Sequence, residues 1–185
     1  MATSPLTSLV SGLGYVRIGA IRMPSNASSS LILNWTDPYE QLLIYVAVPF
    51  YAGADLASLR FGNGNFVIDS GTNYQSRTVT LAAGTVTPLI DAPQTSDTMF
   101  RLGIATANGR SGWIHVTNFS NRNKVIKAAI TIGTTDATSV ADAHLSVEGM
   151  WANTTDFIKS CQFVLPGAGK LGTGSQFIVY GMNAA

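Results

Sequence analysis

Short runs of alternating apolar and polar residues, separated by polar turns, cover most of the chain. Residues 31–35, Leu-Ile-Leu-Asn-Trp, show this two-residue period, which is typical of strands that are buried on one face. No stretch of about 12 residues keeps the 3.6-residue period of an amphipathic helix. Glycine, asparagine and serine cluster between the runs, as in Asp69-Ser70-Gly71 and Asn108-Gly109-Arg110-Ser111-Gly112, and these residues predict turns. The pattern predicts an all-β protein.

The expected strands are short and follow one another at regular intervals, which is typical of a β-sandwich or barrel. They cover residues 15–23, 31–35, 42–50, 58–62, 74–82, 99–105, 113–119, 124–132, 144–151, 160–165 and 176–181. Residues 42–50 are apolar on both alternating faces, which predicts a central strand covered on both sides. Residues 176–181 are partly apolar on both faces, so this strand should be internal or covered by a neighbouring molecule.

The first residues lack this periodicity. Residues 1–14 are rich in Ser, Thr, Gly and Pro, which predicts an N-terminal arm outside the sandwich. Such an arm either stays mobile or orders against a neighbouring subunit. Residues 15–185 are predicted to form one β-sandwich domain, because a chain of 185 residues suits a single core.

The chain carries very little charge, and this excludes several classes of partner. Charged residues make up 11% of the sequence, with a net charge of +1, whereas an ordinary globular domain has about 25%. The few Lys and Arg residues are scattered, so we expect neither nucleic acid nor an anionic membrane as partner. Hydrophobic residues make up 46%, enough to exclude wholesale disorder. The longest apolar run, residues 42–50, is too short to cross a bilayer as a helix.

The N-terminus has neither the basic nor the apolar segment of a secretory signal. The glycosylation sequons at Asn26, Asn34, Asn118 and Asn153 are therefore expected to be chance triplets that stay unmodified. Cys161 is the only cysteine, so the chain has no disulfide framework and no cysteine-based zinc cluster.

Two nucleotide-binding motifs are matched only in part. Gly167, Gly169 and Gly172 satisfy G-x-G-x-x-G, but the fingerprint requires a helix after the glycines. Here residues 176–181 read as a strand, so the glycines are expected to form a hairpin connection. Gly169-Lys170 does not continue as a P-loop, because Leu171 occupies the position of the Mg²⁺-binding Ser or Thr.

Candidate catalytic and metal-binding residues are few. Cys161 with His115 or His144 could form a nucleophile pair, but alternating apolar neighbours favour a small buried thiol at Cys161. Asp55 and Asp69 could supply oxygens to a Ca²⁺ ion, although their spacing fits turn capping better. The sequence therefore predicts no catalytic residue, no cofactor and no metal site.

Aromatic residues crowd the first half of the chain, from Tyr39 to Tyr74. Most are expected to lie in the core. Those near Phe50 and Tyr51 are candidates for a subunit interface, and Tyr180, on the apolar second face of the last strand, is a third candidate.

Four blocks in a fixed order resemble the virion structural proteins of tailed bacteriophages. They are residues 39–48, residues 57–62 together with the Asp-Ser-Gly-Thr-Asn-Tyr of residues 69–74, residues 151–165 and residues 174–181. The resemblance covers most of residues 30–182. Two departures are the longer turn before Asp69, and Pro49-Phe50 where the family often has Arg-Ser.

The resemblance implies a jelly-roll sandwich with a role in the particle and no catalysis. The first expectation is a homotrimeric capsid decoration (cement) protein, made in the host cytoplasm, that bridges adjacent subunits of the major capsid protein on the virion surface. The alternative is a tail-fibre, tail-tip or head-fibre module that binds host surface glycans through aromatic side chains and loop oxygens.

Overall fold

The structure is a computed structural model that describes residues 14–24, 30–52, 55–63, 65–82, 89–90, 94–105, 108–133, 143–165 and 170–183. These residues form strands and connecting loops, which confirms the all-β prediction. No helix in the described ranges is long and apolar enough to cross a membrane. All but the last residue of the predicted arm, residues 1–14, lies outside them, so the division from a domain over 15–185 stays a prediction.

Fourteen strands are found in the described part of the chain. They are β1 (Val16–Arg22), β2 (Ser30–Asn34), β3 (Gln41–Ala52), β4 (Asp55–Gly62), β5 (Tyr74–Ala82), β6 (Leu89–Ile90), β7 (Gln94–Asp97), β8 (Phe100–Ala105), β9 (Asn108–Thr117), β10 (Lys124–Ile132), β11 (Ala143–Trp151), β12 (Ser160–Val164), β13 (Lys170–Leu171) and β14 (Gln176–Met182).

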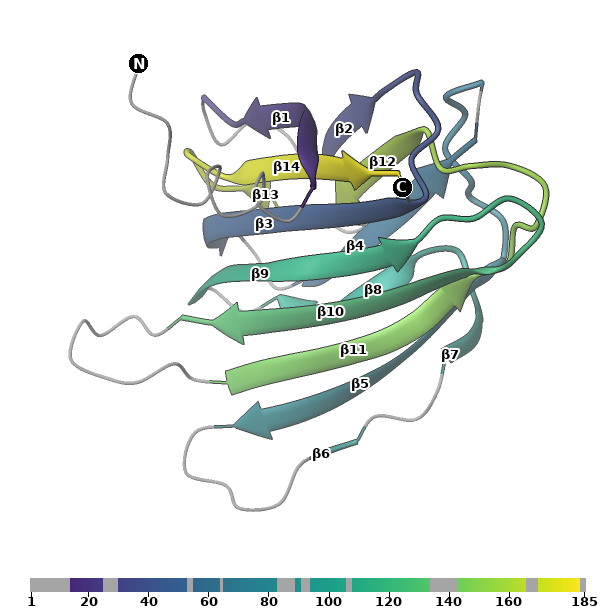
Figure 1. The fold of residues 1–185 in the computed structure, drawn as a ribbon. Coiled ribbons are helices and arrows are strands. Elements are labelled where there is room, and N and C mark those ends of the chain that lie inside the picture. The colour runs from purple at the N-terminus through teal and green to yellow at the C-terminus, as the bar shows by residue number, and fades with distance from the viewer. Residues whose placement is uncertain are drawn as a thin grey trace.

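The strands form two antiparallel sheets. The larger has ten strands in the order β1-β14-β3-β9-β10-β11-β5-β6, with β13 beside β3 and β7 beside β5. The smaller has the order β2-β12-β4-β8 and lies behind the larger one in Figure 1. β3 lies between β14 and β9, and β14 lies between β1 and β3, so both strands predicted to be internal are internal.

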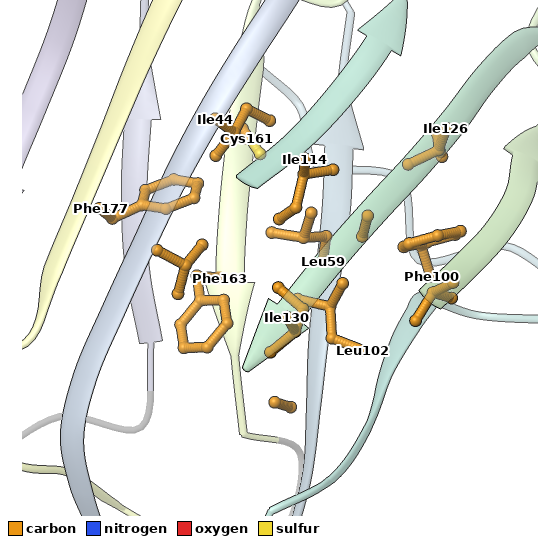
Figure 2. Packing of buried hydrophobic residues seen from close by; sticks show 14 of the residues in the cluster. Ile44, Leu59, Phe100, Leu102, Ile114, Ile126, Ile130, Cys161, Phe163 and Phe177 are labelled. Carbon is orange, nitrogen blue, oxygen red and sulfur yellow. The ribbon is translucent and has the colours of Figure 1, made fainter. Parts of the chain in front are cut away.

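The hydrophobic core fills the space between the sheets. Along β10, inward residues such as Ile126 and Ile130 are buried, whereas their neighbours point to solvent. Figure 2 shows Ile44 and Ile114 of the larger sheet packed toward Leu59 and Phe163 of the smaller one. Burial of this apolar surface is the main term that stabilises the two-sheet arrangement.

One segment predicted as a turn is part of a strand. Residues 108–112, Asn-Gly-Arg-Ser-Gly, form the first half of β9 and pair with β3 and β10. The two glycines fit there because the strands approach closely. A Cβ at Gly109 would lie 2.3 Å from the carbonyl oxygen of Pro49, and one at Gly112 would lie 2.2 Å from that of Ala129. Glycine marks close backbone approach here and not a turn.

Candidate functional site

The second and third blocks of the sequence pattern meet at one corner of the sandwich. We name the set Phe61, Asp69, Asn73, Tyr74 and Trp151 the Asp69 corner. The Asp69 carboxylate accepts hydrogen bonds from Trp151 Nε1 at 2.6 Å, from Asn73 Nδ2 at 2.9 Å and from the backbone N–H of Gly71 at 2.8 Å. The bond from Trp151 holds the loop before β5 against the end of β11, and the other two bonds lie within that loop.

The ring of Tyr74 completes the corner. Its hydroxyl accepts a hydrogen bond from the backbone N–H of Phe61 at 2.8 Å and lies 3.3 Å from the carbonyl oxygen of Asp69, to which it can donate. The rings of Phe61, Tyr74 and Trp151 pack with centroids 6.0–6.3 Å apart. Burial raises the pKa of the Tyr74 hydroxyl far above its ordinary value, so this group stays protonated.

The Asp69 carboxylate caps a turn, which is the role favoured by its sequence. Burial alone raises the pKa of Asp69, but the hydrogen bonds from Trp151, Asn73 and Gly71 and the charge of Arg60 outweigh it, so the pKa is lowered. Both carboxylate oxygens already accept hydrogen bonds. The side chain of Asp55, the other candidate Ca²⁺ ligand, lies outside the described residues. In the described ranges no group of three or more His, Cys, Asp or Glu could hold a metal ion.

A buried lysine joins two loops next to this corner. The Lys124 ammonium donates to the carbonyl oxygens of Phe119 at 2.7 Å, Arg122 at 2.8 Å and Asn153 at 2.9 Å. Burial lowers the pKa of Lys124, and the charge of Asp156 opposes this effect. The three carbonyls use all three donors of the ammonium, so its role is structural.

Asn118 has a similar role between β9 and the loop before β12. The residue is fully buried. Its side-chain NH₂ donates to the carbonyl oxygen of Tyr39 at 2.7 Å, and its Oδ1 accepts from the backbone N–H of Ile158 at 2.7 Å. The sequon at Asn118 is therefore inaccessible in the folded chain.

A second hydrophobic cluster lies on the outer face of the larger sheet, away from the core. Tyr15 and Tyr180 are buried there, with Leu43, Trp113, Ile178 and Met182 packed against them. The ring of Trp113 lies 4.9 Å from that of Tyr45 and 6.1 Å from that of Tyr180, measured between centroids. We name these seven residues the aromatic face. Its members lie on the adjacent strands β14, β3 and β9 (Figure 1), and Tyr15 lies just before β1.

Polar side chains border the aromatic face. The Tyr15 hydroxyl donates to Gln41 Oε1 at 3.1 Å, and His115 Nε2 lies 3.1 Å from the same oxygen. Burial and the charge of Lys127 both lower the pKa of His115, so the ring is neutral at pH 7.

The structure separates the residues of the candidate nucleophile pair. Cys161 lies fully buried in the core on β12, as its sequence predicts, and burial raises the pKa of its thiol. His115 lies on the outer face of the other sheet, where it contacts Gln41. His144 is exposed on β11 beside Thr131. A thiol that is buried, protonated and away from both imidazoles does not serve as a nucleophile.

One of the three glycines that match the nucleotide fingerprint lies among the described residues. Gly167 and Gly169 lie outside the described residues. Gly172 lies between β13 and β14, so a strand follows it and not a helix, as expected from the sequence. Between the sheets, Val46, Leu102, Arg110 and Phe163 line a cavity of about 10 Å³, which has room for one water molecule.

Of the three candidate interface residues, only Tyr180 has a described side chain, and it belongs to the aromatic face. The side chains of Phe50 and Tyr51 lie outside the described residues. Tyr15, Tyr45 and Trp113, the other aromatic members of this face, were not among the interface residues predicted from the sequence. The apolar second face of residues 42–50 was the signal that could have located Tyr45.

Tyr45, on the outer face of the larger sheet, and Phe66 differ from the expectation that most aromatic residues of the first half lie in the core. Phe66 is 42% exposed, and its neighbour Val67 is 66% exposed. Phe66 also has a positive φ of 60°, which is uncommon for a residue with a bulky side chain.

No family model and no curated protein matches this sequence.

Proposed function

We propose that this protein is a structural subunit of a tailed-bacteriophage virion, and specifically a homotrimeric capsid decoration protein that bridges adjacent major capsid protein subunits. The observation that carries the proposal is the Asp69 corner. Asp69, Asn73, Tyr74 and Trp151 belong to the blocks that resemble virion proteins. The Asn73 and Trp151 side chains donate to the Asp69 carboxylate, and the Tyr74 hydroxyl lies 3.3 Å from the Asp69 carbonyl oxygen. The resemblance to virion proteins therefore rests on residues that stabilise the fold.

We also propose that the sandwich is a jelly roll with added strands. Without β5–β7, β10, β11 and β13, eight strands remain, and in chain order the first pairs with the last, the second with the seventh, the third with the sixth and the fourth with the fifth. This is the pairing of one long hairpin wrapped around a core, and it supports a jelly-roll topology. Along each arm of the hairpin successive strands lie in alternate sheets, and only the fourth and fifth, which form the turn of the hairpin, share a sheet.

Three described reactive side chains support a role without catalysis, because each has a place in the fold. The Lys124 ammonium binds three carbonyl oxygens, the Asp69 carboxylate caps a turn, and Cys161 is sealed in the core. With few charges to form ion pairs, attachment to a capsid would rest on buried area and on hydrogen bonds of neutral side chains. Such attachment is nearly independent of salt.

The test is to locate the protein in purified virions of the phage that encodes it. We expect trimers on the capsid surface in a cryo-EM map, and their loss from particles made after deletion of the gene. Decoration should persist from low to high salt. A chain absent from the virion, or released steeply as salt rises, would contradict the proposal. A position on the tail together with binding on a host-glycan array would favour the alternative, a receptor-binding module.

A further inference from the structure

We propose that Phe66 and Val67, which we name the apolar tip, attach this chain to another protein by inserting into an apolar pocket on that protein's surface. This inference deepens the proposed function and rests on it for the identity of the partner, the major capsid protein. The apolar tip lies in the loop between β4 and β5, shortly before Asp69 in the chain.

The apolar tip differs from the other large hydrophobic residues that are exposed in the described ranges. Those residues are Val16, Ile32, Leu81 and Val125. They are aliphatic and lie singly on strands, as is common on soluble proteins. Phe66 and Val67 are instead neighbours in a loop, and Phe66 is aromatic. Aromatic residues are enriched at protein interfaces, where a few side chains carry most of the binding energy.

Phe66 lies on a strained turn. Its φ of 60° is in the left-handed region, which is unfavourable for a bulky side chain. Such a conformation persists only where the surrounding structure holds it, and it occurs preferentially at functional sites. Here the Phe66 N–H donates to the carbonyl oxygen of Asn63 at 2.9 Å, and Asn63 Oδ1 accepts from the N–H of Asn65 at 3.1 Å. These two hydrogen bonds hold the turn.

The base of this loop is fixed to the sandwich. Gly62 and Ile68 form an antiparallel bridge, and the N–H of Asp69 donates to the carbonyl oxygen of Phe61 at 2.8 Å. The loop also lies close to β4, since a Cβ at Gly62 would lie 2.6 Å from the carbonyl oxygen of Val67. The Asp69 corner holds the end of the loop against β11. Side chains on a fixed loop lose little conformational entropy on binding, so the apolar tip is preorganised for a partner.

The chemistry of the loop favours a protein pocket over a membrane or a glycan. Residues 62–68, Gly-Asn-Gly-Asn-Phe-Val-Ile, carry no charge. The flanking Arg60 and Asp69 are opposite in sign, and both make hydrogen bonds within the chain. Attachment to an anionic membrane requires a cluster of Lys and Arg instead. Val67, the more exposed member of the tip, is aliphatic and has no ring to stack on a sugar. An apolar pocket accommodates both side chains, and their burial supplies the binding energy.

The experiment titrates labelled full-length protein onto capsids from phage that lack its gene. Phe66→Asn removes the ring and suits the backbone, because asparagine tolerates a positive φ. Val67→Thr keeps the shape of the side chain but makes it polar. Val125→Thr is the matched control, since Val125 is 45% exposed on β10.

We expect the Kd for capsids to rise about 100-fold in the double variant Phe66→Asn/Val67→Thr, as for the loss of two anchors of an interface. In Val125→Thr the Kd should stay within about twofold of the wild type. The Tm of Phe66→Asn should equal or exceed that of the wild type, because the substitution relieves backbone strain. Weaker binding by a variant that melts no earlier is then a loss of contact and not of fold.

The outcomes separate this inference from the proposed function. A folded double variant that binds capsids as tightly as the wild type overturns the apolar tip as the attachment point and leaves the capsid role intact. A wild-type chain that does not bind these capsids overturns both. Flotation with vesicles of phosphatidylcholine and phosphatidylglycerol that is lost in the double variant would assign the tip to lipid. A smaller mass of the double variant in light scattering would assign the tip to a second copy of the chain. Either of these last two results overturns the capsid pocket as its partner.

Discussion

Replacement of Asp69 by alanine tests whether the Asp69 corner is the structural centre that the hydrogen bonds indicate. The variant loses three hydrogen bonds to a carboxylate, from Trp151, Asn73 and Gly71. Trp151 is only 1% exposed, so its indole N–H would remain buried without its charged acceptor. That loss costs about 2 kcal/mol, and the two exposed bonds add about 0.5 kcal/mol each. We expect the free energy of unfolding to fall by about 3 kcal/mol.

The assay is urea unfolding followed by tryptophan fluorescence, with all variants at one protein concentration because self-association would shift the midpoint. For a chain of this size, the loss corresponds to a fall of about 6–12 °C in Tm. Asp37→Ala is the matched control, because the hydrogen bonds to that exposed carboxylate are long, at 3.4 and 3.5 Å. It should change stability by less than about 0.5 kcal/mol.

A double-mutant cycle isolates the central bond of the corner. In a Trp151→Phe background the indole donor is already gone, so Asp69→Ala should cost about 1 kcal/mol and not about 3. If Asp69→Ala costs the same in both backgrounds, or costs no more than Asp37→Ala, the carboxylate does not hold β11 to the loop and the reasoning is refuted.

Four further predictions follow from single contacts. Lys124→Met leaves three carbonyl oxygens without their donor, so chemical denaturation should show a loss of about 3 kcal/mol. Gly112→Ala should destabilise by about 2 kcal/mol in the same assay, because its Cβ would meet a backbone oxygen, whereas Gly19→Ala, with 3.4 Å to the nearest atom, should be tolerated. The Cys161 thiol should react with Ellman's reagent only at the rate of unfolding, and fast labelling of the native protein would contradict its burial. The pKa of His115 is below its ordinary 6.5 in the folded state, so the unfolded chain takes up the proton first as pH falls. The free energy of unfolding should therefore decrease below about pH 6.5. Thermal melts of His115→Gln should lack this part of the decrease.

The strands, and the alternation of buried and exposed residues along them, could be predicted because two-residue periodicity is a local property of the sequence. β10 and β11 follow it with hardly an exception. β9 was harder to predict because Gly109 and Gly112 are turn residues by composition, and only the carbonyl groups of other strands show why glycine stands there. The short strands β6, β7 and β13 were missed, since their length leaves no period to detect.

For the candidate site residues too, sequence neighbours predicted some features, and only the tertiary structure shows the others. The buried thiol of Cys161 and the capping role of Asp69 were expected from neighbouring residues. The partners of Asp69 were not, since Trp151 lies 82 positions away and only tertiary structure brings the two together. The aromatic face was anticipated through Tyr180 alone, because Trp113 joins it through pairing of β9 with β3.

The burial of Asn118 has a consequence for how the chain can be produced. Oligosaccharyl transferase acts on a nascent chain before strands have paired, and Asn118-Phe119-Ser120 is an acceptor sequence. A glycan added there would occupy the position where the amide must bind Tyr39 and Ile158, and the chain could no longer close its sandwich. Synthesis through a eukaryotic secretory pathway should therefore yield glycosylated, misfolded material, whereas the same gene expressed in bacterial cytoplasm escapes the modification.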